Sequence, residues 1–487
     1  MAMSTPDRER ICLVIPPSVF LLDERVFMTL GILRVAAVLE MAGYPVEVLD
    51  LSGVSNYCEA ASDHACDSRA DVFGFTATTP QLPASIEIAN AIRKTRPNSR
   101  LILGGPHVTM VNAARRTGSP RAGRSFTRLL ESFDVLVAGD GERAIFEALE
   151  SSTALVDADN PRSTLFLNNA SLTELPLPAR HLVDVESYHY SIEGVKATSV
   201  IAQLGCPFGC GFCGGRSSPT FRKIRMRSIE SIIAELDHLY TVYGFTGFMF
   251  YDDELNVNPQ MTSLMQAIKN LQSYLCVDFK LRGFIKAELF TNEQAAAMYG
   301  AGFRWILTGF ESGSPRILRN IEKRATREDN MRCVEIARRN GLKVKALMSL
   351  GHPGESPETI AETREWLLET RPDDFDATII TTYPGTPYYD QASEVSDGIW
   401  RYEVHGDALY SLEVDYAKVA DYYKGDPNDG YVSYVYTDHL SRTELVSRRN
   451  ALEKELRERL GIPFNPSVPA QRYEHSMGQL PSHILKT

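Results

Sequence analysis

Three cysteines, Cys206, Cys210 and Cys213, form a C-x3-C-x2-C pattern directly after an apolar run at 197–203 that predicts a β-strand. Three thiolates on one tight loop are good ligands for an iron–sulfur cluster. A cluster held by four protein thiolates, or a structural zinc site, needs a further ligand nearby, and the next cysteine is Cys276. The spacing therefore predicts a [4Fe–4S] cluster with one iron left open.

Two other interpretations of these cysteines stand beside the cluster. One is half of a zinc site that distant residues complete, and the other is chance clustering. Chance is a poor explanation, because three of only 8 cysteines lie within this short loop. The zinc interpretation stays open at this point.

The motif resembles the signature of the radical SAM (S-adenosylmethionine) family, C-x3-C-x-aromatic-C at the end of the first barrel strand, with Phe212 in the aromatic position. The resemblance implies that the amino and carboxylate groups of SAM chelate the open iron. Reduction of the cluster would then cleave SAM to a 5′-deoxyadenosyl radical. An external electron donor of the flavodoxin or ferredoxin type is implied as a partner.

Composition sets broad limits on the chain. Its 487 residues, 44% hydrophobic and 23% charged, are typical of two or three globular domains. The net charge is −11, and the basic stretch at 319–327 is interrupted by Glu322, which favours a solvated face over a nucleic-acid site. No apolar run reaches the length of a membrane span, and the N-terminus lacks a signal-peptide core. We expect a cytoplasmic enzyme with a small-molecule substrate, and neither nucleic acid nor membrane as partner.

Residues 1–150 alternate predicted strands with helices, which is typical of a doubly wound, flavodoxin- or Rossmann-like parallel sheet. The strands are expected at 11–16, 46–51, 71–76, 101–103 and 134–138. Ligands of such sheets bind at the carboxyl ends of the strands. Small or polar residues lie at those ends: Ser18, Thr76, Thr78, Thr79, Gly104, Gly105, Gly139 and Gly141.

Placed before a radical SAM motif, this domain resembles the cobalamin-binding domain of cobalamin-dependent radical SAM enzymes. The stretches that carry the resemblance are 30–33 (LGIL), 104–107 (GGPH) and 139–142 (GDGE). The resemblance implies cobalamin contacts at Thr76, Thr78, Gly104, Gly105 and Gly139. The D-x-H-x-x-G element is absent, which implies a buried nucleotide tail and no histidine on cobalt. The alternative is a domain that has lost cobalamin and only packs on the barrel.

Residues 151–196 are interpreted as a linker with an edge strand at 165–167. From 197 to 390 the sequence shows six strand–helix units, which predict a partial (β/α)6 barrel matching the radical SAM family. Residues 391–487 form a small α+β extension. It contains a tyrosine-rich stretch at 402–436 and a capped helix ending at Leu460, and its tail after 466 is expected to be loosely ordered. The tyrosines either cover the substrate mouth or make core and turn contacts.

Polar residues follow the predicted barrel strands, where barrel enzymes keep their sites. The acidic triplet 252–254 resembles the position that contacts the amino group of SAM, with Asp253 or Glu254 as the contact. Arg282 and Lys286 are candidates for the SAM carboxylate or an acidic substrate, by charge-assisted hydrogen bonds. A salt bridge from Lys286 to Glu288 is the alternative.

Two later strand ends complete the expected SAM site. Glu311 and Ser312 resemble the position that contacts the ribose of SAM. Gly351, in the stretch 350–355 (LGHPGE), resembles the element that lets the backbone approach the adenine. His352 is either a proton carrier or, as we favour, a loop residue.

The leading functional hypothesis from the sequence is methylation of an unactivated carbon in a small-molecule or natural-product substrate. One SAM would methylate reduced cobalamin, and a second would yield the radical that activates the substrate. Two alternatives remain: a non-methylating cyclisation or rearrangement, and a non-catalytic cobalamin-binding or electron-transfer module. We expect substrate-specific residues in 383–436.

Overall fold

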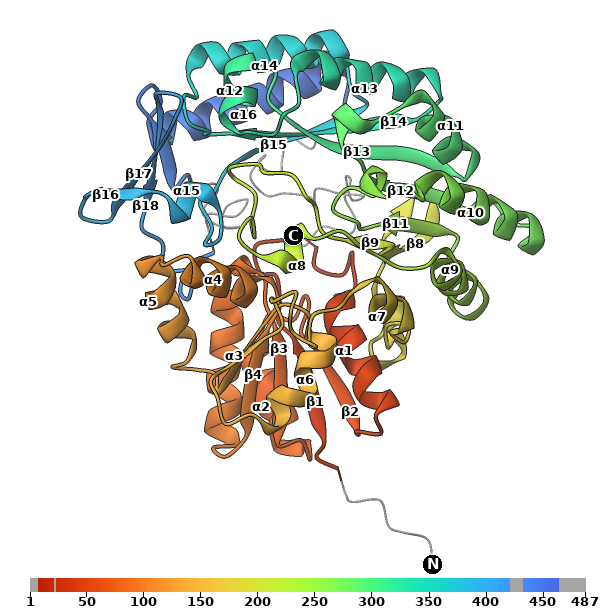
Figure 1. Ribbon diagram of the computed structural model, residues 1–487, viewed down its shortest axis with the longest axis vertical. Helices are drawn as coiled ribbons and strands as arrows, with labels where there is room; N and C mark the ends of the chain where they lie inside the picture. Colours follow the sequence, from red (N-terminus) through yellow and green to blue (C-terminus); the bar gives the residue numbers. More distant parts are fainter. Residues whose placement is uncertain (1–7, 22, 421–431, 464–487) are drawn as a thin grey trace, which may run out of the picture.

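The computed structural model describes residues 8–21, 23–420 and 432–463. The fold is α/β, as expected: an N-terminal parallel sheet, a curled second sheet above it, and a small C-terminal sheet at the side (Figure 1). Three of the predicted tyrosines, Tyr422, Tyr423 and Tyr431, lie outside the described residues, as does the tail after 466.

The N-terminal sheet has six parallel strands in the order β2-β1-β3-β4-β5-β6. Chain order reverses between β1 and β3, and ligands of open parallel sheets bind at such a switch point. The strands are β1 (Ile11–Ile15), β2 (Val46–Asp50), β3 (Val72–Thr76), β4 (Arg100–Gly104), β5 (Val135–Ala138) and β6 (Leu155–Asp157).

Side chains of these strands alternate between two apolar clusters because successive residues of a strand point to opposite faces. Leu13 packs with helices α1 and α6, whereas Cys12 and Val14 pack on the opposite face with helices that include α2 and α3. The helices of this domain are α1 (Leu30–Met41), α2 (Tyr57–Asp67), α3 (Leu82–Thr95), α4 (Pro106–Arg116), α5 (Pro120–Leu129) and α6 (Gly141–Glu150).

The edge strand expected at 165–167 is wrong, because the edge is formed by β6, which pairs with β5. Phe166 and Leu167 are buried, which explains their apolar character, but they lie in an irregular segment. The backbone N–H of Leu167 donates to the carboxylate of Asp140 over 3.2 Å instead of to a strand.

The second sheet contains six parallel strands with one short antiparallel strand, β7 (Ser191–Ile192), at its edge. The six parallel strands confirm the predicted partial barrel. They are β8 (Val195–Val200), β11 (Gly247–Phe250), β12 (Lys280–Phe284), β13 (Phe303–Glu311), β14 (Lys343–Leu350) and β15 (Asp374–Ile379). Its larger helices are α9 (Ile229–Tyr243), α10 (Met261–Leu275), α11 (Asn292–Gly300), α12 (Pro315–Asn320), α13 (Arg327–Arg339) and α14 (Pro357–Thr370).

Helix α16 (Arg442–Leu460) lies along the open edge of the barrel sheet at β15. Arg449 Nε donates to the Ala377 carbonyl over 2.6 Å, and Arg457 Nη2 donates to the Phe375 carbonyl over 2.8 Å. Two arginine side chains thus satisfy edge carbonyls that a further strand would otherwise pair. The small C-terminal sheet consists of β16 (Ser393–Ser396), β17 (Ile399–Val404), β18 (Asp407–Leu412) and β19 (Val435–Thr437).

The domain boundaries at 150, 196 and 390 stay predictions. Strand β6 of the first sheet lies beyond residue 150, and β7 of the second lies before residue 197. We propose that the first domain extends to 157 and that the barrel unit begins at 191. In the part of the chain that is described, no helix combines the length and the apolar character needed to cross a membrane.

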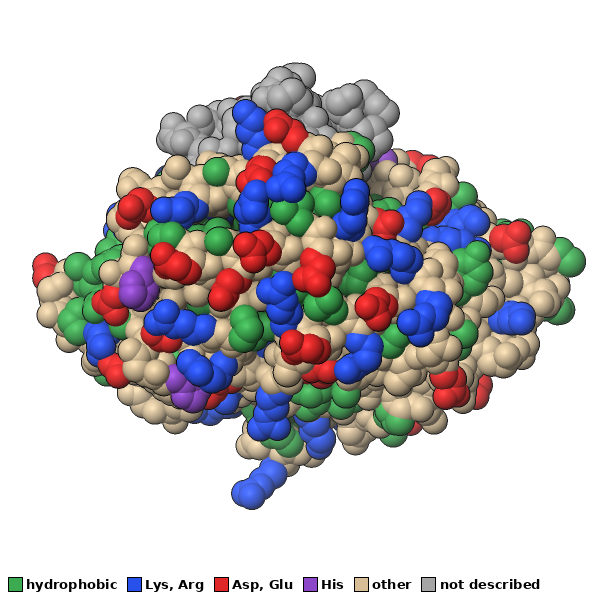
Figure 2. Space-filling view, turned by 90° about the horizontal axis from the view of Figure 1, so that it is seen from above, with side chains coloured by type: hydrophobic (Ala, Val, Ile, Leu, Met, Phe, Trp, Pro, Cys, Tyr) green, Lys and Arg blue, Asp and Glu red, His purple; other side chains and the backbone are tan. Residues whose placement is uncertain are grey.

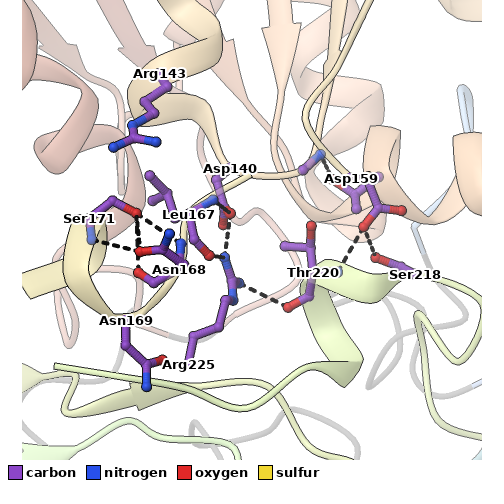
Figure 3. Close-up of polar contacts among 12 residues, drawn as sticks. Asp140, Arg143, Asp159, Leu167, Asn168, Asn169, Ser171, Ser218, Thr220 and Arg225 are labelled. Carbon is purple, nitrogen blue, oxygen red and sulfur yellow. Dashed lines mark hydrogen bonds and ion pairs between the residues drawn. The ribbon is translucent and has the colours of Figure 1, made fainter. Parts of the chain in front are cut away.

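Two buried polar contacts hold the domains together, and Figure 3 shows both. Arg225 of β10 (Arg225–Met226) contacts Asp140 and donates to the Thr220 carbonyl over 2.9 Å. Asp159 accepts from the Ser218 hydroxyl over 2.7 Å and from the Thr220 N–H over 2.8 Å. The segment that follows the cysteine loop is therefore fixed to the N-terminal domain.

A buried carboxylate on α9 is the centre of a third contact. Glu235 accepts from Arg180 over 2.8 Å and from Arg227 over 2.5 Å, and all three side chains are almost fully buried. Burial opposes ionisation, but Arg180, Arg227 and Arg34 together lower the pKa of Glu235 to about 2. Through Arg180, Glu235 and Arg34, this charge cluster connects the linker, α9 and α1.

Replacing Glu235 with Gln is expected to lower the free energy of unfolding by about 3–5 kcal/mol, because it leaves buried arginines unpaired. The lowered pKa adds a pH dependence. The stabilising contribution is complete above the ordinary pKa of 4.5 and is lost as the pH falls towards about 2. Denaturant titration of both proteins between pH 7 and pH 3 tests this, since their difference should shrink with acidification. Glu230→Gln, an exposed change on the same helix, is the control.

Candidate functional site

The cysteine loop lies between the two sheets, in the centre of Figure 1. The Cys206 N–H donates to the Phe221 carbonyl over 2.9 Å, and the Gly211 N–H donates to the Ile321 carbonyl over 2.9 Å. Gly211 is required by close packing, because a Cβ there would lie 2.7 Å from the ring of Tyr388. The loop is therefore held in one conformation by three different parts of the chain.

The three thiols interact with one another without converging on a single ion. Burial is the main reason that the pKa of Cys213 is raised, and the charges of Cys210 and Cys206 raise it further. Within the described residues, however, only Cys12, Glu47 and His64 bring three such ligand atoms within 4.8 Å of one another. A wider arrangement of thiols suits a polynuclear cluster better than one zinc ion. The donor set thus fits the [4Fe–4S] group that the spacing predicts.

Phe212 packs against α12. It contacts the cluster of Ile317, Leu318 and Ile321, and its ring centroid lies 5.2 Å from that of His352. The aromatic residue of the motif therefore anchors the loop to the barrel.

Two lysines bring positive charge to the cysteine loop. Burial raises the pKa of the Cys210 thiol, and the ammonium groups of Lys323 and Lys286 oppose that rise. Lys323 pairs with Glu311 over 2.9 Å. Lys286 pairs with Glu288 over 2.6 Å, as the alternative interpretation had it, and its ammonium group lies 4.1 Å from the ring centroid of Phe208. Both lysines stabilise anionic ligands at this site.

The three acidic residues after β11 have different surroundings. Asp252 accepts from the backbone N–H groups of Ala202 and Gln203, so it holds the chain after β8. Asp253 accepts from the Gly205 N–H over 2.8 Å and borders a cavity of the N-terminal domain. In the described residues the side chain of Glu254 has no hydrogen-bond partner.

We propose that Glu254, and not Asp253, contacts the amino group of SAM. Burial raises the pKa of Glu254 to about 7, and Lys323 and Lys286 oppose the rise. Because an ammonium group pairs with the ionised carboxylate, SAM affinity should fall as the pH drops through about 7. Glu254→Gln should weaken SAM binding about tenfold or more and remove this pH dependence. Calorimetric titration of the cluster-loaded protein between pH 6 and pH 8 measures both effects, and Asp253→Asn should leave SAM affinity near that of the parent.

Arg282 lies within β12 and not after its end. Its guanidinium lies 5.4 Å from the ring centroid of Trp305, and its charge affects Tyr190. Arg282 is not among the groups with the largest electrostatic effects on the three motif cysteines. On this placement Lys286 is the better candidate for the SAM carboxylate.

The residues predicted to contact the ribose and the adenine also have different surroundings. Glu311 faces the loop through Lys323 and also accepts from Ser349 over 2.7 Å. Ser312 is buried against α14, with its hydroxyl 2.9 Å from that of Thr363. The Gly351 N–H donates to Glu355 over 3.1 Å, in a backbone conformation with a φ of 89° that favours glycine.

His352 belongs to a buried hydrogen-bond chain. Its Nε2 lies 2.8 Å from the Ser349 hydroxyl and its Nδ1 lies 3.3 Å from the Tyr388 hydroxyl. Burial lowers the pKa of His352 to about 4, so the ring is neutral near pH 7. This agrees with a structural loop residue more than with a proton carrier.

A cavity of about 410 Å³ separates the N-terminal sheet from α1 and α6 and reaches the barrel. The predicted cobalamin residues Thr76, Gly104, Gly105 and Gly139 border it. Its far wall comes from the barrel side, with Gly205, Phe221 and Arg225. A slot between a sheet and its helices suits the buried nucleotide tail of a cobalamin.

A second cavity, of about 600 Å³, lies over the carboxyl ends of the same strands. Thr78 borders it, as do Ser199 and Tyr251 from the barrel and Gly214 from the end of the cysteine loop. The two cavities share four lining residues, which are Gly31, Pro106, Ile201 and Tyr251. Among the described residues, no histidine lines either cavity, and the absence of a histidine ligand to cobalt stays a prediction.

The segment 383–436, where substrate-specific residues were expected, contributes little to these cavities. Tyr383 lines the larger one. Tyr402 packs on Tyr388, Tyr410 stacks on Tyr436, and Tyr416 donates to the Thr382 carbonyl. The described tyrosines after 400 therefore make packing contacts.

Sequence reasoning missed Lys323, Arg225 and Arg34 as residues of the site. Lys323 belongs to the basic stretch that we had assigned to solvent, and no local motif marks it. Arg225 and Arg34 both line the smaller cavity and are almost fully buried. Their only signal in the sequence is an arginine within or beside an apolar segment.

Two family models match the chain, one over the N-terminal sheet and one over the barrel sheet. The B12 binding domain matches residues 24–119, and the radical SAM superfamily matches residues 200–367. The first match includes Thr76, Thr78, Gly104 and Gly105, and the second includes the cysteine loop.

Relatives of known sequence match across both domains. The chain is 28% identical to an uncharacterised methyltransferase of Pyrococcus horikoshii over 328 residues, 66% of this chain and 69% of that protein. It is 22% identical to an anaerobic magnesium-protoporphyrin IX monomethyl ester cyclase of Cereibacter sphaeroides, over 81% of this chain and 64% of the cyclase.

The fold is similar to that of a solved enzyme along nearly its whole length. The radical S-adenosylmethionine methyltransferase TsrM from Kitasatospora setae, solved with cobalamin and a [4Fe–4S] cluster bound, matches with a TM-score of 0.64 and 17% identity. The match covers 94% of this chain and 89% of TsrM. The cobalamin-dependent radical enzyme OxsB matches with a TM-score of 0.56 and 16% identity, over 79% of this chain and 54% of OxsB.

These domain matches, with the fold and the donor set of the loop, define the class of the protein. The chain belongs to the cobalamin-dependent radical SAM enzymes, and its cofactors are a [4Fe–4S] cluster, SAM and cobalamin. Enzymes of this class require a reductant and act on a substrate.

Proposed function

We propose that this enzyme methylates an unactivated carbon of a small-molecule substrate. The observation that carries the proposal is the pair of joined cavities. Residues at the cobalamin-side strand ends, Thr78 and Pro106, line the same space as Ser199 and Tyr251 of the barrel and Gly214 beside Cys213. A methyl carrier and a radical source would then face one substrate.

Different residues would bind the cofactors at the two ends of this space. When bound, cobalamin supplies a methyl carrier, and SAM on the cluster supplies an organic radical. Cys206, Cys210 and Cys213 would hold the cluster, with Glu254 and Lys286 orienting SAM by its charged groups. The glycines and threonines at the strand ends would hold cobalamin, and Tyr251 would form the wall between the two.

The cofactor products test this function. With the true substrate, methylation yields S-adenosylhomocysteine together with 5′-deoxyadenosine and a methylated product. Chromatography with mass spectrometry of a reaction with methyl-labelled SAM measures all three. The result against methylation is product that carries no label, with 5′-deoxyadenosine as the sole SAM-derived product.

A second candidate function is a cobalamin-dependent radical cyclisation without methyl transfer. The match to a cyclase over 81% of this chain favours it. The same experiment separates the two candidates, because cyclisation gives unlabelled product. The methyltransferase is preferred because the methyltransferase relative is 28% identical over 69% of its length, whereas the cyclase is 22% identical over 64% of its length.

A further inference from the structure

Arginines from separate segments surround the cysteine loop. Arg222, at the end of α8 (Pro219–Arg222), contacts the Pro207 carbonyl of the loop. The guanidinium of Arg216 lies close to Gly209 of the loop, since a Cβ on Gly209 would be 3.2 Å from it. Arg319 on α12 and Arg324 just after it are exposed. We call these four side chains the arginine rim.

Loop contacts explain why the rim forms there. The Gly211 N–H donates to the Ile321 carbonyl, and Phe212 packs on Ile317, Leu318 and Ile321. These contacts press the segment 315–324 against the loop. The basic stretch that the sequence assigned to a solvated face therefore lies beside the predicted cluster ligands.

Arg319 and Arg324 are the less compensated charges of the rim, since Arg319 acts only at longer range on Asp407, which itself pairs with Arg316. Arg216 pairs with Glu322 over 3.0 Å. No ion pair of Arg319 or Arg324 occurs among the described residues. On the face of the molecule seen from above, acidic and basic side chains are interspersed (Figure 2). A local positive surface on a chain of net charge −11 points to an acidic partner.

We propose that the arginine rim is the docking surface for a small acidic protein that carries single electrons. The carrier loses one electron and the cluster, in its oxidised form, gains it. The donor is thereby oxidised by one unit and the cluster is reduced by one. This inference rests on the radical SAM class and not on the methylation proposed above.

The position suits this role because Pro207 and Ser217, at either end of the loop, are exposed. A carrier held on the rim approaches the cluster loop directly, without crossing the barrel. Complementary charges mainly speed association and fix orientation, and salt screens them. The rim therefore predicts a salt-sensitive, transient complex.

Binding of an oxidised flavodoxin tests the surface without any turnover. The variant is Arg319→Gln/Arg324→Gln, which spares Arg216 and Arg222 because both contact the loop itself. The dissociation constant of the cluster-loaded enzyme for flavodoxin, measured calorimetrically at low salt, should rise about tenfold or more, and its dependence on salt should flatten. Arg339→Gln/Arg448→Gln, with the same charge change at exposed positions on α13 and α16, should bind as the parent does.

A second measurement compares two reductants. With reduced flavodoxin as donor, SAM cleavage by the rim variant should slow about tenfold, whereas with dithionite, a small reductant that needs no docking surface, it should match the parent. Equal slowing with both reductants, or unchanged flavodoxin affinity, overturns the proposal. Neither measurement uses substrate, so a failure of the methylation proposal leaves this test intact.

Discussion

A variant with alanine at Cys206, Cys210 and Cys213 is expected to bind no iron–sulfur cluster and to form no 5′-deoxyadenosine. The reason is that these three thiolates are the proposed protein ligands of the cluster, and SAM has no iron to chelate without it. Anaerobic reconstitution followed by iron and sulfide analysis and visible absorbance measures cluster content. We expect complete loss of these signals, with the fold retained.

Cys276→Ala is the matched control, since this exposed cysteine lies outside the loop. It should reconstitute like the parent. Metal analysis after incubation with zinc addresses the other interpretation of the loop. Full cluster content in the triple variant, or stoichiometric zinc at the loop in the parent protein in preference to iron, contradicts the assignment.

Replacing Gly104 with Phe is expected to abolish cobalamin binding. Gly104 ends β4 and borders the cavity of about 410 Å³. A Cβ on Gly104 would meet its nearest neighbours at 3.7–3.8 Å, which is ordinary contact, so the backbone accepts a side chain there. A phenyl ring would then occupy the space proposed for the nucleotide tail. The affinity for hydroxocobalamin should fall by ~100-fold, about 2.7 kcal/mol. The variant should therefore retain little hydroxocobalamin on gel filtration.

Gly104→Ala is the control, because a methyl group fits and leaves most of the cavity open. Cluster content of Gly104→Phe should equal that of the parent, which shows that the barrel is intact. Gly139 is unsuitable for this test, since a Cβ there would lie 2.5 Å from the Asp159 backbone nitrogen and would disturb the chain itself. Normal cobalamin retention by Gly104→Phe would place cobalamin outside this cavity.

Features that depend on local spacing were predictable from the sequence. The cysteine loop follows from three residue types at fixed intervals, and the six barrel strands follow from alternating apolar runs and helices. The strand ends also follow, because parallel strands bring Thr76, Gly104 and Gly139 to one edge of a sheet. Local patterns thus predicted the fold class, and the place of both cofactor sites stays a prediction.

Features that depend on tertiary contacts were not predictable. Asp253 and Glu254 are neighbours with similar chemistry, and only the fold directs one to Gly205 and leaves the other beside Lys286 and Lys323. Lys323 reaches the loop from more than a hundred residues away. The error at 165–167 arose because burial, and not strand pairing, explains the apolar residues there.

The helix at the open barrel edge has a consequence for how the chain is made. During synthesis β15 emerges well before α16, so its carbonyls at Phe375 and Ala377 await Arg457 and Arg449 until the helix leaves the ribosome. An exposed strand edge is a template for pairing with other chains. The barrel is therefore vulnerable to aggregation until its last helix arrives, and a nascent chain stalled before Arg442 would carry an unprotected edge.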